Sequence, residues 1–179
     1  MANIVHFSDD DQKRFSKIVS RFLKNIKEAD PLNIIVTEAA VKEYPKEWIL
    51  HYFLSDKYQS VGRIAESVNA AKYCVELRPR DLRSAYALAT GYNMLIRAGF
   101  SEELALQINT EFGLTGTDII DPKKSMSELE KLDITIEAAA AEAIKWFKRS
   151  LMLDPDIPSK KHLESTLDGL FKGFPQLKL

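Results

Sequence analysis

Apolar side chains recur at helical spacing in the first part of the chain. Phe15, Ile18, Val19 and Phe22 share one face of a helix, and charged residues occupy the positions between them. Three aspartates, at positions 9 to 11, follow Ser8 and favour the positive end of a helix dipole. The pattern predicts a helix over residues 9–27.

The same periodicity continues along most of the sequence, and no segment has the alternation typical of a strand. Asp30 and Pro31 resemble a helix start, and that helix is expected to end near Pro45. Turn-forming residues predict a loop over 113–122. The remaining helices are predicted at 46–57, 60–77, 82–98, 101–112, 127–132, 135–153 and 159–172. The sequence therefore predicts an all-α fold.

An internal repeat is superimposed on this pattern. Between residues 45 and 92, matching residue types recur at a spacing of 34 positions. The matched pairs are Pro45 and Pro79, Tyr52 and Tyr86, Leu54 and Leu88, Ser55 and Ala89, and Tyr58 and Tyr92.

A second set of residues recurs at a spacing of 76, which indicates an insertion of about 42 residues within one repeat. Small side chains at the matched positions let neighbouring helices approach closely, and each proline ends a helix. The pairs are Ser67 and Ala143, Cys74 and Ser150, Val75 and Leu151, Leu77 and Leu153, and Pro79 and Pro155.

These residues resemble the tetratricopeptide repeat, a helical hairpin of 34 residues, over about positions 46–157. The resemblance implies a right-handed α-solenoid of antiparallel helical hairpins in a single domain. Ser67 and Ala71 depart from the family pattern, which has alanine and an aromatic residue there. The expected units are a degenerate N-terminal hairpin (1–45), one repeat (46–81), a repeat (82–157) split by an insertion at about 99–136, and a C-terminal capping helix with its tail (158–179).

In this family the first helix of each hairpin lines a concave surface that binds peptides. When the family's register is applied to this sequence, the resemblance implies a partner-binding surface made of Ile49, Tyr52, Asp56, Gln59, Arg83, Tyr86, Thr90, Asn93 and Arg97. The alternative is that Tyr52 and Tyr86 only fill the floor of this surface. Some relatives grip the C-terminal carboxylate of chaperones through basic residues and asparagines, but Tyr52, Asp56 and Tyr86 occupy the matching positions, so this clamp is largely absent here.

The insertion carries apolar residues that would form a lid over the groove or an exposed contact, or would only cover the split hairpin. These residues are Phe100, Leu104, Leu106, Ile108, Phe112, Ile119 and Ile120.

Charge and composition exclude several classes of function. Lys and Arg total 25 against 26 Asp and Glu, so no basic excess indicates nucleic-acid binding. No apolar run reaches the ~18 residues of a membrane span, and the start of the chain lacks the pattern of a signal peptide, so a cytoplasmic location is expected. The single cysteine, Cys74, falls on a packing position where burial would make it inert.

No catalytic residue, metal site or cofactor is predicted. His6, His51 and His162 lie far apart in sequence, and no phosphate loop or nucleophile motif is present. The favoured hypothesis is a protein-interaction module, an adaptor, assembly factor or chaperone-like protein, that holds a peptide or protein segment. The alternative is a self-associating helical protein that forms a homo-oligomer through the insertion or the terminal helix.

Overall fold

The computed structural model describes residues 9–23, 34–99, 102–111, 121–157 and 160–178. These residues form nine α-helices and two short 3-10 helices and contain no strand, which confirms the all-α prediction for this part of the chain. The elements are α1 (Asp9–Leu23), α2 (Ile34–Glu43), α3 (Trp48–Ser60), α4 (Ile64–Leu77), α5 (Leu82–Leu95), η1 (Ile96–Gly99), α6 (Glu102–Glu111), α7 (Pro122–Leu132), α8 (Ile136–Leu153), α9 (Lys160–Gly173) and η3 (Pro175–Leu177).

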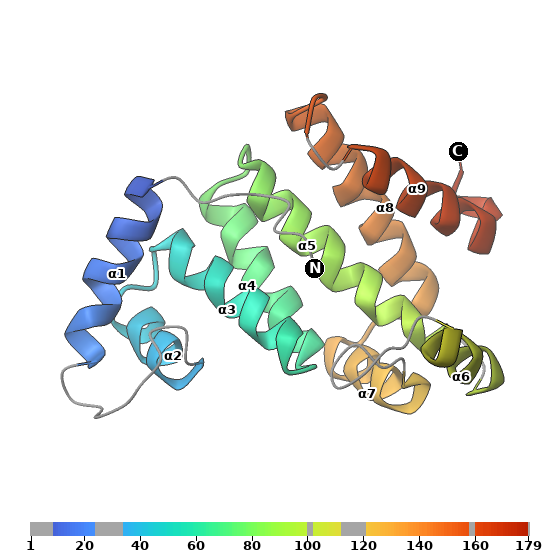
Figure 1. The fold of residues 1–179 in the computed structure, drawn as a ribbon, viewed down its shortest axis with the longest axis horizontal. Helices are drawn as coiled ribbons and strands as arrows, with labels where there is room; N and C mark the ends of the chain where they lie inside the picture. Colours follow the sequence, from blue (N-terminus) through green and yellow to red (C-terminus); the bar gives the residue numbers. More distant parts are fainter. Residues whose placement is uncertain (1–8, 24–33, 100–101, 112–120, 158–159, 179) are drawn as a thin grey trace.

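The helices follow one another along the longest axis of the molecule (Figure 1). Helices α1 and α2 lie at one end, α3, α4 and α5 occupy the middle, and α8 and α9 lie at the other end. Consecutive helices pack against each other from α1 to α5, and α5 then packs most extensively against α8. Helices α6 and α7, from the predicted insertion, lie at one edge beside the end of α5.

A separate apolar cluster joins the two N-terminal helices to α3. Phe15 and Val19 of α1 are buried against Val36 of α2 and against Trp48 and Ile49 of α3. The Phe15 and Phe53 rings lie 3.9 Å apart between centroids. The predicted apolar face of the first helix is therefore its buried face, while its predicted end at residue 27 and the predicted cap Ser8 lie outside the described residues.

Small residues set the close approach of the central helices. The hydroxyls of Ser55 in α3 and Ser67 in α4 are buried and lie 3.0 Å apart within hydrogen-bond distance. A Cβ at Gly91 of α5 would meet the Cγ2 atom of Val68 in α4 at 3.0 Å, so α4 and α5 approach as closely as they do because residue 91 has no side chain.

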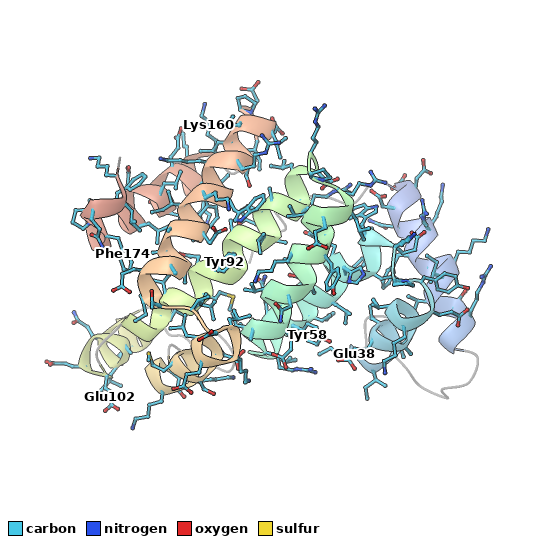
Figure 2. The ribbon with its side chains drawn as sticks, turned by 180° about the vertical axis from the view of Figure 1, so that it is seen from behind. Glu38, Tyr58, Tyr92, Glu102, Lys160 and Phe174 are labelled. Carbon is cyan, nitrogen blue, oxygen red and sulfur yellow. The ribbon has the colours of Figure 1, made fainter. Side chains whose placement is uncertain are left out.

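The largest core lies between α5, α8 and α9. Tyr92 of α5 (Figure 2) and Phe147 of α8 belong to this core. Leu163, Leu167 and Leu170 are the buried stripe of α9, as their spacing predicted. Phe174 and Leu177, around η3, pack against the same core and extend it towards the end of the described chain.

Positions that match in sequence also match in burial. At the spacing of 34, Leu54 and Leu88 are both buried, as are Ser55 and Ala89, and Tyr58 and Tyr92. At the spacing of 76, Ser67 and Ala143 are both buried, as are Cys74 and Ser150. Residues matched at these two spacings in α3, α4, α5 and α8 thus have the same burial.

The structure corrects several predicted boundaries: α3 continues to Ser60 rather than ending at residue 57, α4 begins at Ile64 rather than at residue 60, and the start of α7 also moves. Asp121 and Pro122, expected in a loop, begin α7 instead: the Asp121 carboxylate accepts hydrogen bonds from the backbone N–H groups of Lys123 and Lys124, at 3.1 and 3.2 Å. Proline is favoured at the first helical position because its missing N–H has no partner there in any case. Helix α7 therefore begins five residues before the predicted start at Ser127.

Candidate protein-binding face

Two residue stripes on neighbouring helices carry the predicted binding residues. Tyr52, Asp56 and Gln59 recur at helical spacing on α3, and a second stripe lies on α5, which contacts α3 directly. We call these two stripes together the α3–α5 face; its residues are Tyr52, Asp56, Gln59, Tyr86, Thr90, Asn93 and Arg97.

Ile49 does not belong to this face. Its side chain is fully buried, at 0 % exposure, in the cluster that α3 forms with α1 and α2. The N-terminal hairpin covers the position at which the repeat register predicted a surface residue. The assignment of Ile49 to a binding surface is therefore wrong, and its role is to hold the N-terminal hairpin in place.

Arg83 is held by contacts within the protein. Its guanidinium donates to the carboxylates of Asp11 in α1, at 2.7 Å, and Asp81, at 2.9 Å. It also stacks 4.5 Å from the centroid of the Trp48 ring. Burial alone would lower the pKa of Arg83, because it disfavours the charged guanidinium. The hydrogen bonds to Asp81 and Asp11 outweigh this effect, so the pKa of Arg83 is raised. Arg83 thus joins α1 and α3 to the start of α5.

The two tyrosines form the half-buried floor of the α3–α5 face. Tyr52 packs against both the N-terminal cluster and the large core. The Tyr86 ring meets the Phe147 ring edge-on, with 6.1 Å between centroids. Burial raises the pKa of both hydroxyls, and the nearby Asp56 carboxylate raises that of Tyr52 further. Both phenols are therefore neutral at physiological pH.

The other predicted binding residues are polar side chains on the same two helices and on η1. Asp56 is exposed, Gln59 and Asn93 are half-buried, and the side chains of these three residues make no hydrogen bond or ion pair with the described part of the chain. Thr90 is half-buried, and its hydroxyl donates to the Tyr86 carbonyl of the same helix at 3.0 Å. Arg97 is half-buried near the end of the stripe, in η1. Apart from Ile49 and Arg83, the predicted face residues are exposed or half-buried side chains on α3, α5 and η1, and α3 and α5 contact each other.

Helix α7 of the insertion is fastened to the hairpin α3–α4 by a buried carboxylate. Glu128, only 4 % exposed, accepts a hydrogen bond from the backbone N–H of Ala65, at 2.7 Å, in the first turn of α4. Lys131 of α7 donates to the other oxygen of the same carboxylate at 2.5 Å. Arg63, which precedes α4, supplies no side-chain cap of its own. Glu128 therefore caps α4 from a distant part of the chain.

This docking was not predicted from the sequence. Helical spacing places Glu128 beside Leu129 and Leu132 on one side of α7, and that position was the only available signal. Helix α7 also packs against η1 and α5, and Leu129 is buried. Helix α7 thus covers part of α4, α5 and η1.

Helix α6 presents a different surface. Ala105 is buried, but Leu106 is 68 % exposed, and Met126 on the neighbouring α7 is also exposed. The exposed side chains of Glu102 and Lys123 join α6 to α7 by an ion pair at 3.0 Å, and Figure 2 shows Glu102 at the outer edge of the molecule. The other apolar residues singled out in the insertion, Phe100, Leu104, Ile108, Phe112, Ile119 and Ile120, lie outside the described side chains.

Groups that could carry chemistry are isolated in the described part of the chain. Cys74 is fully buried, its thiol donates to the Trp48 carbonyl at 3.4 Å, and burial raises its pKa, which leaves the thiol unreactive as predicted. The His51 ring lies 2.8 Å from the Pro45 carbonyl, and His162 is exposed; His6 lies outside the described residues. No grouping of three or more His, Cys, Asp or Glu suited to a metal ion occurs among the described residues.

None of the described helices combines the length and apolar character that a membrane crossing requires.

Comparison with known proteins assigns neither a family nor a function to this chain. The sequence matches no family model, and no curated protein is significantly similar to it.

Proposed function

We propose that this chain is a tetratricopeptide-like helical solenoid. The support is the agreement between sequence and packing: residues that match at spacings of 34 and 76 have the same burial, and α5 packs against α8 across the intervening insertion. A repeat unit buries its apolar surface against its neighbours, so equivalent positions should be buried alike. In this proposal α1–α2, α3–α4 and α5–α8 are the hairpins, and α9 caps the stack.

We further propose that the α3–α5 face binds an extended segment of another protein. The observation that carries this proposal is that Asp56, Gln59 and Asn93, whose side chains have no partner among the described residues, lie on the same helices as the half-buried tyrosines. Amide side chains such as Gln59 and Asn93 can donate to and accept from a peptide backbone. Tyrosine rings offer a large contact area at a small cost in conformational entropy. The combination suits an adaptor, assembly factor or chaperone-like protein.

A variant with three side chains replaced by alanine tests this function without disturbing the fold. Gln59→Ala, Thr90→Ala and Asn93→Ala together remove polar groups of the face while leaving Tyr52, Arg83 and the core unchanged. The control variant carries Asn69→Ala, Lys72→Ala and Glu76→Ala, which truncate exposed residues of α4. Both variants should keep the circular dichroism of the parent protein.

The measurement is affinity purification from the native cell extract, followed by mass spectrometry. We expect a partner that is retained by the parent protein and the α4 control but lost by the face variant, because only the latter lacks the groups that contact the segment. A partner that binds all three proteins equally would contradict the assignment of the α3–α5 face.

Self-association is the competing hypothesis, and the exposed Leu106 and Met126 of the insertion favour it. The two hypotheses differ in the mass of the purified protein in dilute solution. Multi-angle light scattering of the parent protein distinguishes them: the binding function predicts a monomer, whereas a concentration-dependent oligomer would favour the insertion as an interface between copies of the chain.

A further inference from the structure

Asp56 differs from the other carboxylates that are close to the core. Asp11 and Asp81 pair with Arg83, Glu38 and Glu66 pair with Arg63, and Glu128 pairs with Lys131. The Asp56 side chain has neither an ion pair nor a hydrogen bond within the described ranges, although it lies on α3, which contacts α5.

The surroundings of Asp56 disfavour its charge. The side chain is exposed, yet desolvation by the neighbouring protein atoms raises its pKa, and the adjacent Lys57 only partly offsets this effect. Tyr52 lies one helical turn away, close enough for the Asp56 charge to raise the pKa of its hydroxyl. Asp56 is therefore accessible to a ligand while the protein partly desolvates its carboxylate.

The one arginine near this part of the face is already engaged. The positive charge of Arg83 is close enough to Tyr52 to offset part of the rise in the pKa of that tyrosine. The Arg83 guanidinium itself is held by Asp11 and Asp81 and stacked on Trp48. Turning it towards Asp56 would break both ion pairs. Among the described residues, no basic side chain is thus positioned to pair with Asp56, and a bound segment can supply the complementary positive charge.

We propose that Asp56 receives a lysine or arginine side chain of the segment bound on the α3–α5 face. A cation paired with Asp56 would also lie close to the Tyr52 ring, where a cation–π contact adds to the ion pair. Charge complementarity of this kind selects among partners more than it adds affinity. This inference rests on the proposed function, which it deepens by naming the chemistry of the segment.

Selection from a library of random peptides tests it. The parent protein should enrich peptides that share a lysine or arginine at one fixed position. Asp56→Asn keeps the size and hydrogen-bonding capacity of the side chain, and we expect it to bind those peptides about tenfold more weakly, as is common for loss of an interfacial charge pair. An Asp56→Lys variant should in turn prefer the same peptides with glutamate at that position.

The stability of Asp56→Asn provides a check on folding. Because the folded-state pKa of Asp56 lies above its ordinary value of 3.8, ionisation of this carboxyl destabilises the fold at neutral pH. The variant should therefore be at least as stable as the parent at pH 7. This difference should disappear below pH 3.8, where Asp56 is protonated in both the folded and the unfolded protein. Weaker binding by a variant of equal or greater stability cannot be explained by unfolding.

The outcomes separate this inference from the function on which it rests. Peptides that require the Gln59, Thr90 and Asn93 side chains but show no basic preference, or bind Asp56→Asn unchanged, would overturn the inference and leave the binding function standing. A library that yields no binder sensitive to the three face substitutions would contradict both.

Discussion

Phe147→Ala is expected to lower the free energy of unfolding by about 3–5 kcal/mol, the usual cost of removing a buried phenylalanine side chain. Phe147 is 3 % exposed, and its ring meets Tyr86 of α5 while lying in the core shared with α9. The substitution leaves a cavity where α5 packs against α8, the contact that closes the proposed split repeat. Urea denaturation followed by circular dichroism measures the loss.

Met152→Ala is the matched control, because Met152 lies on the same helix but is 72 % exposed. Exposed substitutions usually change stability by less than about 0.5 kcal/mol. If Phe147→Ala cost no more than this control, the pairing of α5 with α8 would not be a main source of stability, contrary to the fold described above.

Glu128→Ala is expected to cost about 2–3 kcal/mol, the range for a buried donor left without its charged acceptor. The Ala65 N–H in the first turn of α4 would lose its only capping group, and Lys131 would lose its ion-pair partner. For a chain of this length, the loss corresponds to a fall of roughly 5–10 °C in the melting temperature. Differential scanning calorimetry measures this fall.

Two further variants make the Glu128 result specific. Glu130→Ala removes an exposed carboxylate from the same helix and should leave the melting temperature almost unchanged. Glu128→Gln retains an oxygen acceptor without the charge. Its melting temperature should therefore lie between those of Glu128→Ala and Glu130→Ala. Equal melting temperatures for Glu128→Ala and Glu130→Ala would show that α7 is not held by its buried carboxylate.

Local sequence signals predicted the helices better than their ends. The apolar stripes at Phe15 and Val19, and at Leu163, Leu167 and Leu170, are buried as expected, because periodicity depends only on residues within one helix. The start of α7 was missed because Asp121 and Pro122 resemble a turn as much as a cap. Which form such a pair takes depends on what the following helix packs against.

The candidate site was predicted less completely, because it depends on contacts between distant segments. The repeat register places Ile49 on a surface, and only the packing of the N-terminal hairpin shows that it is covered. Arg83 was expected to contact a partner, but Asp11, 72 residues earlier in the chain, holds it. The spacing of Tyr52, Asp56 and Gln59 places them on one side of α3, because helical periodicity depends only on residues within one helix.

Site-specific photo-crosslinking in the native cell tests the central claim most directly. A photoactivatable amino acid would replace Asn93 on the α3–α5 face in one protein and Asn69 on the exposed side of α4 in another. The proposed function predicts one discrete crosslinked partner from position 93 and none from position 69. Crosslinks to the same partner from position 69 but not from position 93 would contradict the assignment of the α3–α5 face as the binding site.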